Sequence, residues 1–369
     1  MKIKTKISNL LPALDSLARV ASKPNSGVYS KVLFQLMQDE LVLVASNGHV
    51  QVSVPVKDCA IEGGRSYAVD FYKLHSIIKT LPEEKPATLN FKDDGKLSLS
   101  CGKSRSSIGY IDGADYPTML VYEAKDYIKG TEEIGDAIHA VSFASARKHT
   151  RKNANGVTLF SSNGKLSVAA TDTVQMAMIN LDVDFTGEAI IPIWSIGVVR
   201  QFMSSDFLFY VESGSLHIEN NGSVCVVNLI DMPRLPFERL IPSEDLRANS
   251  LTFDKGWMLD VLNRISIVAD NPQTTRCVVE LPSGTSDATI VGYEVNGINK
   301  STDSITINND GDGTTVAFNP KLAMGMLSAV NPENKSDDNI ISCGIYNTSG
   351  SPLAFRGGNF IGILGQVRV

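Results

Sequence analysis

The stretch VAATDTVQMAMI, from Val168 to Ile179, reads as two short strands joined by a polar turn at Thr171-Asp172. Apolar and small residues alternate on both sides of the turn, which is typical of a half-buried antiparallel pair. A similar stretch, LVASNGHVQVSV, runs from Leu43 to Val54, with Ser46-Asn47 at the turn. An apolar helical segment precedes each copy. The chain therefore contains an internal repeat.

Each copy belongs to a longer unit in which a helix, a run of strands, a second helix and further strands follow one another. The unit occurs three times with a period of about 120 residues, far above the period of a solenoid. A strand passes directly into a helix at Val69-Asp70, Pro192-Ile193 and Phe318-Asn319. We therefore expect an α+β fold of three tandem domains, over residues 1–122, 128–245 and 247–369.

The composition places the chain among globular proteins with large cores. It has 369 residues, 43% of them hydrophobic, and a net charge of −6, which excludes a simple basic nucleic-acid binder but not a local basic surface. The first residues lack the apolar segment of a signal peptide, and no apolar run approaches the ~20 residues that a membrane span needs. We expect a cytoplasmic protein that does not enter the membrane.

Motifs of catalysis or metal binding do not emerge. The five cysteines form no CxxC pair and suggest small buried residues, and the five histidines have no metal spacing. Gly102-Lys103-Ser104 lacks the earlier glycine of a phosphate loop, and Asp310-Gly-Asp-Gly313 lacks the glutamate of a calcium loop. We expect no enzymatic activity, no cofactor and no metal.

Positive charge concentrates in the predicted helices. Of the net charge of −6, six helical segments account for +5 and the rest of the chain for −11. The densest basic run, Arg147 to Lys152, follows a predicted helix and is by itself often only a solvated loop. The family resemblance given in the next paragraph implies instead contact with a DNA backbone, which is independent of sequence and sensitive to salt. The candidate DNA-binding residues that it implies are Lys23, Lys73, Lys79, Arg147, Lys148, Arg151, Lys152 and Arg200.

Several motifs occur in an order that is known from one family. They are NGVTLF followed by VAATD, IDMPRLPFERLIP ending at Pro242, TFDKGWMLDVLNRISIVAD from Thr252 and VAFNPKLAMGML from Val316. Along its whole length the chain resembles the bacterial β sliding clamp, the processivity subunit (β subunit) of DNA polymerase III. The resemblance implies a head-to-tail dimeric ring with outer β-sheets and twelve inner helices. Helices ~10 Å apart would enclose a hole of roughly 25 Å, enough for duplex DNA.

The resemblance also implies partners and their sites. Polymerase and clamp loader would insert short peptides into a cleft, unless its apolar residues are ordinary strand core. Thr173-Val174-Gln175-Met176 replaces the usual Gly-His-Arg-Leu, and Leu322 the usual Tyr, so we expect a different peptide. The cleft residues would be Thr171, Thr173, Val174, Met176, Pro242, Asn319, Leu322, Val367, Arg368 and Val369.

The resemblance is weaker at the expected interface between the two copies, which we call the seam. Lys103 and Arg105 match a basic edge strand, while the acid-rich edge that faces it in the family is here Asn296 to Asp303. Ile267 and Val268 would pack across the seam, which we expect to depend less on ion pairs than usual. The alternative function is a ring-shaped scaffold that does not slide on DNA.

Overall fold

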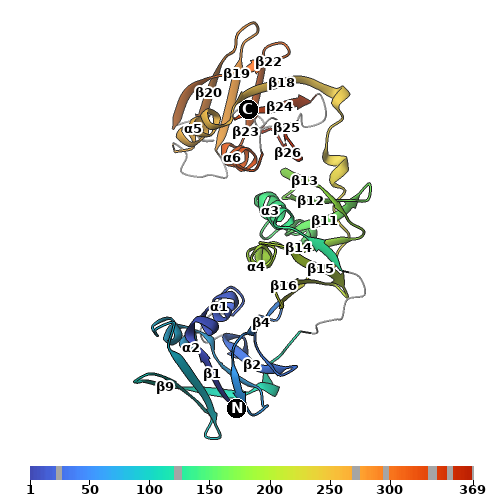
Figure 1. The fold of residues 1–369 in the computed structure, drawn as a ribbon. Helices are drawn as coiled ribbons and strands as arrows, with labels where there is room; N and C mark the ends of the chain where they lie inside the picture. The colour runs from blue at the N-terminus through green and yellow to red at the C-terminus, as the bar shows by residue number, and fades with distance from the viewer. Residues whose placement is uncertain are drawn as a thin grey trace. The chain divides into compact units, whose positions relative to one another are not determined.

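A computed structural model describes residues 1–21, 27–119, 127–267, 275–293, 299–330, 339–346 and 352–367. Across these residues one order of elements occurs three times: a strand, a helix, four or five strands, a second helix and three strands. The three passes follow one another from blue through green to red in Figure 1. The predicted α+β fold class is confirmed.

The elements of each pass have the following bounds. The first pass contains β1 (Lys2–Lys6), α1 (Ile7–Leu17), β2 (Lys31–Met37), β3 (Glu40–Ser46), β4 (Val50–Val56), β5 (Ala60–Glu62), β6 (Tyr67–Asp70), α2 (Phe71–Lys79), β7 (Pro86–Lys92), β8 (Lys96–Cys101) and β9 (Ser104–Asp112). The second contains β10 (Ile128–Gly130), α3 (Glu132–Val141), β11 (Gly156–Ser162), β12 (Lys165–Thr171), β13 (Gln175–Asp184), β14 (Glu188–Pro192), α4 (Ile196–Phe202), β15 (Phe207–Glu212), β16 (Ser215–Asn220) and β17 (Ser223–Asn228). The third contains β18 (Arg247–Asp254), α5 (Lys255–Ser266), β19 (Arg276–Leu281), β20 (Asp287–Tyr293), β21 (Lys300–Thr306), β22 (Asn308–Asn309), β23 (Thr314–Phe318), α6 (Pro320–Ala329), β24 (Ile340–Tyr346), β25 (Leu353–Gly357) and β26 (Phe360–Leu364).

Short polar side chains start three of the helices. The Asp70 carboxylate accepts a hydrogen bond from Lys73 N at 2.9 Å and so caps α2, and Asp254 caps α5 in the same way. Asn319 caps α6 through Lys321 N, also at 2.9 Å. These side chains satisfy backbone N–H groups that the first turn leaves without partners.

Two helices are shorter than the sequence predicts. Apolar residues at helical spacing, among them Leu14, Leu17 and Ala21, predict a first helix from Ser8 to Ala21, but this helix ends at Leu17. The sequence also predicts a helix from Ile134 to about Ala146. It ends at Val141, because Ser142–Ala144 forms a tighter turn and Ala146 N donates to Ala154 O at 2.9 Å. The basic run after it therefore lies on a loop, separate from the helix end.

The chain forms two compact units, Met1–Gly135 with Ser195–Leu229 and Asp136–Trp194 with Ile230–Val369. The first contains a 13-stranded sheet, and the second contains sheets of nine and four strands. Each unit takes part of the second pass, so the three domain boundaries expected above stay a prediction.

Within each unit the same kind of strand pair joins two passes. The last strand of the second pass, β17, runs antiparallel to β4, the third strand after α1, and Val224 faces Ser53. The last strand of the third pass, β26, runs antiparallel to β13, and Ile361 faces Met178. Val224 and Ile361 are both the second residue after a two-residue hairpin turn.

Both joints have the same register. One row of directly opposite residues crosses the first pass as Ala68, Leu33, Val44 and Ser53, and another crosses the second pass as Ile190, Thr158, Ala169 and Met178. Val224 and Ile361 each add a fifth member to a row. The joint is therefore part of the repeat.

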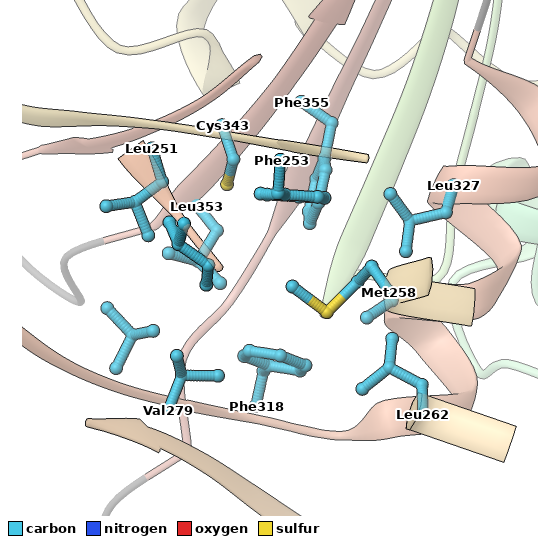
Figure 2. Close-up of a pocket in the computed structure, with 13 residues that line it drawn as sticks. Leu251, Phe253, Met258, Leu262, Val279, Phe318, Leu327, Cys343, Leu353 and Phe355 are labelled. Atoms are coloured by element: carbon cyan, nitrogen blue, oxygen red, sulfur yellow. The ribbon is translucent and has the colours of Figure 1, made fainter. Parts of the chain in front are cut away.

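The core of the third pass lies between its sheets and its helices. Met258 and Leu262 of α5 and Leu327 of α6 point toward Phe253, Phe318 and Phe355 in Figure 2, around a small apolar cavity of about 20 Å³. A cavity of this size and lining holds at most about one water molecule. Helices α5 and α6 pack on each other over this core, as α1 and α2 do over theirs (Figure 1).

In the part of the chain that the structure describes, no helix is long and apolar enough to cross a membrane.

Candidate functional site

The turn between β12 and β13 is held rigid by its own side chains. The Asp172 carboxylate accepts hydrogen bonds from the N–H groups of Val174 and Gln175, both at 2.9 Å. Thr171 Oγ1 donates to Gln175 O at 2.6 Å and accepts from Thr173 N at 3.0 Å. Thr173 takes a left-handed conformation with φ of 79°. The turn therefore presents Val174, which is 54% exposed, in a fixed position.

A groove of about 470 Å³ lies beside this turn, within one compact unit. Its floor is apolar, because Met176 and Ile363 lie opposite each other in the β13–β26 joint and are buried. Leu240 contributes an exposed wall. The lining residues are Arg151, Thr171, Thr173, Val174, Gln175, Met176, Leu235, Pro236, Leu240, Pro352, Ile363 and Gly365.

Arg234 anchors the wall of the groove formed by residues 231–241. Its guanidinium lies 4.4 Å from the centre of the Phe160 ring and 2.8 Å from Glu238, and Glu188 is 3.6 Å away. The hydrogen bonds from Arg234 hold the pKa of the Glu238 carboxyl below its usual range. Cation–π and bidentate contacts both favour arginine over lysine here.

Gln175 lines the groove and carries a polar side chain that is fixed by the turn. Its Nε2 donates to Asp172 Oδ2 at 3.0 Å, which fixes the orientation of the amide, since only the nitrogen can face a carboxylate. Gln175 Oε1 is buried and accepts no hydrogen bond from a described residue. The turn beside the groove thus contains one buried acceptor to which no described residue donates.

The predicted cleft residues divide into two groups. Thr171, Thr173, Val174 and Met176 line the groove. Pro242, Asn319, Leu322 and Val367 are not among its lining residues: Asn319 caps α6, and Val367 N donates to Ala317 O at 2.9 Å. Arg368 and Val369 lie outside the described residues.

Sequence reasoning missed one wall of the groove. Leu235, Pro236 and Leu240 come from a loop without apolar periodicity, although the sequence motif that ends at Pro242 contains all three. Pro352 and Gly365 come from the third pass and reach the groove only through the β13–β26 pairing. Arg151, predicted to bind DNA, lines the groove as well.

The other predicted DNA-binding residues are mostly at the surface. Lys73, Arg147, Lys148, Lys152 and Arg200 are exposed. Lys79 is 3.5 Å from Asp15 of α1, and His75 is 2.6 Å from the same carboxylate. Lys23 lies outside the described residues.

The loop that carries the basic run is fixed by Asn155. His149 N donates to Asn155 Oδ1 at 2.7 Å, and Asn155 Nδ2 donates to His149 O at 2.9 Å. Arg151 N donates to His149 Nδ1 at 3.0 Å. The loop can therefore hold Lys148 and Lys152 in place without helical structure.

The predicted seam residues lie at two strand edges and one helix end. Lys103 is exposed in the β8–β9 turn, and Arg105 donates from one nitrogen to Gly102 O and Ser104 O, both at 2.8 Å. Ile267 is 80% exposed at the end of α5. Val268 lies outside the described residues.

Residues 1–120 match the family model of the DNA polymerase III beta subunit, N-terminal domain. Beta sliding clamps of Chlamydia muridarum and Streptococcus pneumoniae are each 22% identical, over 87% and 88% of this chain and 86% and 88% of their own lengths. The N-terminal third of the chain thus matches the model of this family, and most of its length is similar to bacterial β sliding clamps.

Solved clamp structures have the same fold. The DNA polymerase III subunit beta of Pseudomonas aeruginosa superposes with a TM-score of 0.90 over 100% of both chains at 18% identity. Among the described residues no group of three or more histidine, cysteine or acidic side chains is arranged to hold a metal ion.

Proposed function

We propose that the chain is a DNA sliding clamp. Two copies close head to tail into a ring that encircles duplex DNA without reading its sequence and tethers the replicative polymerase in the cytoplasm. One observation carries this proposal. In each joint, the last strand of one pass pairs with the third strand after the first helix of the pass before it. Two such joints lie within the chain, and they leave two strands of these kinds with an unpaired edge: β9, the last strand of the first pass, and β21, the third strand after α5.

These two edges are complementary in position. On β9, residues 104–109 pair with β8 on one side, while β6 covers only residues 110–112 on the other. On β21, no described strand pairs with the side away from β20. In a single chain both edges stay open. Two copies related by a twofold axis close both, because β9 of each copy then meets β21 of the other.

The repeat specifies the register of the proposed seam. The row of opposite residues in the third pass runs Ala317, Val278, Val291 and Thr302. The second residue after the β8–β9 turn is Arg105. By the rule of the two joints, Arg105 of one copy faces Thr302 of the other, and Ser106 faces Ser301.

The helices follow the same rule. Arg19 and Phe143 each lie two residues after the last buried residue of their helix, and each contacts the second helix of the next pass at a glycine, Gly197 and Gly325. Ile267 has the same position after Ile265. We infer that Ile267 packs on α2 of the second copy near Ser76, which explains its exposure in one chain.

We propose that Lys23, Lys73, Lys79, Arg147, Lys148, Lys152 and Arg200 face DNA phosphates. Exposed ammonium and guanidinium groups on helices and one fixed loop suit attraction that depends on salt and not on base sequence. Lys79 would act with reduced effective charge, because Asp15 is close to it.

We propose that the groove beside Val174 receives a short peptide from the polymerase or the clamp loader. The buried pair Met176 and Ile363 suits an apolar anchor such as Leu or Phe, and the rigid turn offers backbone groups at the rim. Pro242, Asn319, Leu322, Val367, Arg368 and Val369 would act outside the groove, on a second part of the peptide path.

Retention on circular DNA tests the proposal. A loaded ring stays on a nicked circle and slides off when the circle is cut, whereas a protein that binds DNA by contact alone leaves both at similar rates. Rapid loss from uncut circles at low salt, with a dimer still present, would favour the scaffold without DNA function.

A further inference from the structure

An exposed tryptophan adjoins the basic loop, residues 147–155. Trp194 is 53% exposed, although tryptophan is on average highly buried. It lies in a short helical turn, Ile193–Ser195, directly after β14. Ile193 N donates a hydrogen bond to Asn155 O at 3.0 Å, and Asn155 is the residue that fixes the basic loop. The backbone at Trp194 is therefore a neighbour of this loop within one compact unit.

Backbone contacts hold the loop and this turn together. Gly156, the first residue after the loop, pairs with Pro192 in the β11–β14 ladder. Within the loop, Asn155 N donates to Lys152 O at 3.0 Å, so the last cation lies one tight turn before the residue that contacts Ile193. The arrangement of the loop cations next to Trp194 is thus set by the backbone.

The cations of the basic loop are accessible to an anion. Arg147, Lys148 and Lys152 are exposed, and no described carboxylate lies within 4.0 Å of their charged groups. Cations beside an exposed aromatic ring are the two parts of a site for single-stranded nucleic acid, because the cations attract phosphates and the ring stacks on a base. A duplex presents the same phosphates but keeps its bases inside the stack.

We propose that Trp194 stacks on an unpaired base of single-stranded DNA whose phosphates lie against the basic loop. The inference rests on the proposed contact of Lys148 and Lys152 with DNA. On continuous duplex no base is open to the indole, so the ring slides. At a gap or at the end of a primer, the single-stranded template presents a base, and one additional contact holds the clamp there. Any base can serve, since each has an aromatic face.

The second tryptophan of the chain provides the contrast. Trp257, near the start of α5, is 64% exposed, but its neighbours are acidic. The Asp254 carboxylate accepts a hydrogen bond from Trp257 N at 2.8 Å, and the exposed Asp260 lies one helical turn further on. Carboxylates at this distance repel the phosphates that accompany a base. Exposure is similar at the two tryptophans, and the charge beside them is opposite.

Fluorescence of Trp194 tests the stacking directly. The chain has two tryptophans, so Trp257→Phe leaves Trp194 as the reporter. A single-stranded oligonucleotide of about ten thymines should quench its emission, because a stacked base covers the indole. A blunt duplex of the same length should leave the emission unchanged, although its phosphates bind the loop. A Leu- and Phe-containing peptide, which represents an apolar protein segment as the occupant, should also leave it unchanged.

The affinity for the oligonucleotide separates stacking from charge. Trp194→Leu should raise the dissociation constant about tenfold at every salt concentration, because stacking releases no counterions. Trp194→Tyr should restore most of the affinity. Lys148→Gln with Lys152→Gln should instead lower the slope of log affinity against log salt by roughly 1.4, as expected for two phosphate contacts of a single strand. Trp257→Leu is the matched control and should have no effect. All four side chains are exposed, and thermal unfolding checks that the variants are folded.

The results that would overturn the stacking site are distinct from those that would overturn the ring. Emission unchanged by the oligonucleotide, or a dissociation constant of Trp194→Leu within twofold of the unsubstituted chain, would overturn the site. Quenching by the blunt duplex or the peptide as strong as that by the oligonucleotide would also overturn it, because the indole would then contact something other than an unpaired base. Retention of the unsubstituted chain on nicked circles tests the sliding clamp separately.

Discussion

The β13–β26 joint and the open edges of β9 and β21 occupy the same place in the repeat but have opposite chemistry. In the joint, Met176 and Met178 face Ile363 and Ile361, and all but the half-buried Ile361 are buried. On the open edges the corresponding residues are Ser104 to Ser107 and Lys300 to Asp303, which are exposed or half-buried. The same backbone geometry thus serves two interfaces of different polarity.

The difference indicates which interfaces are permanent. An apolar joint gains free energy from burial and does not separate without exposing that surface. A polar seam exchanges hydrogen bonds with water at little net cost and separates more readily. We infer that the proposed ring opens at the seam between copies, while the joints within the chain stay closed.

The largest expected effect comes from a charge placed in the joint. Met178→Lys should lower the free energy of unfolding by about 3 kcal/mol or more, because an ammonium would be buried among apolar side chains without a partner. The corresponding change in the open edge, Thr302→Lys, should alter it by less than about 0.5 kcal/mol. Chemical denaturation measures both, and equal losses would end the distinction between joint and seam.

A smaller effect should follow from the exposed helix end. Ile267→Asp should raise the dimer dissociation constant about tenfold while leaving the unfolding transition unchanged, because the side chain is 80% exposed in one chain. Ile340→Asp, at an isoleucine that is 47% exposed outside the proposed seam, is the control. Analytical ultracentrifugation separates the two, and a wild-type constant for Ile267→Asp would remove this residue from the seam.

The basic loop and the groove should respond separately. Lys148→Gln with Lys152→Gln should reduce the slope of log retention on DNA against log salt by about two, as expected for two lost phosphate contacts. Arg151→Gln should mainly weaken a Leu- and Phe-containing peptide, since Arg151 lines the groove. Fluorescence polarisation measures the affinity for the peptide, and retention on nicked circles at several salt concentrations measures the DNA contacts. Interchanged results would mean that Arg151 belongs with the DNA surface.

The smallest effect concerns pH. Arg234 lowers the pKa of Glu238 in the folded protein, so the stabilisation of the groove wall is present above the unfolded carboxyl pKa and is lost as the pH falls through the lower folded value. Peptide affinity should be constant from pH 7 to about 5 and decline below about 4. Glu238→Gln should have the weaker affinity throughout and lose this decline. A decline that persists in Glu238→Gln would assign it to another group.

Local features of the sequence were enough for the repeat and the turns. Asp70 and Asn319 were recognisable as helix starts because short polar side chains precede apolar helices, and Thr171-Asp172 was recognisable as a turn between alternating strands. These features depend on neighbours within a few residues. For the same reason the order of elements was correct and helix ends were wrong by several residues at Leu17 and Val141.

Partners far apart in the chain could not be predicted in this way. The register that places Ile363 opposite Met176, and the packing of Arg234 on Phe160, depend on pairing between distant segments. The wall formed by Leu235 and Pro236 has no periodic pattern that reveals its contacts. The groove therefore needed the three-dimensional structure, although five of its twelve lining residues lie in the stretch that revealed the repeat.

The register of the seam can be measured directly with a double substitution, Ser106→Cys and Ser301→Cys. Directly opposite residues of antiparallel strands have Cα atoms about 4.5–5.5 Å apart, within the range of a disulfide. Four of the five natural cysteines are buried, and Cys59, which is partly exposed, is removed by Cys59→Ser. Our account predicts a covalent dimer, linked at both seams, that no longer leaves a nicked DNA circle in high salt. Linkage that is equally efficient with Ser106→Cys and Thr302→Cys, one residue out of register, or no linkage at all, would contradict it.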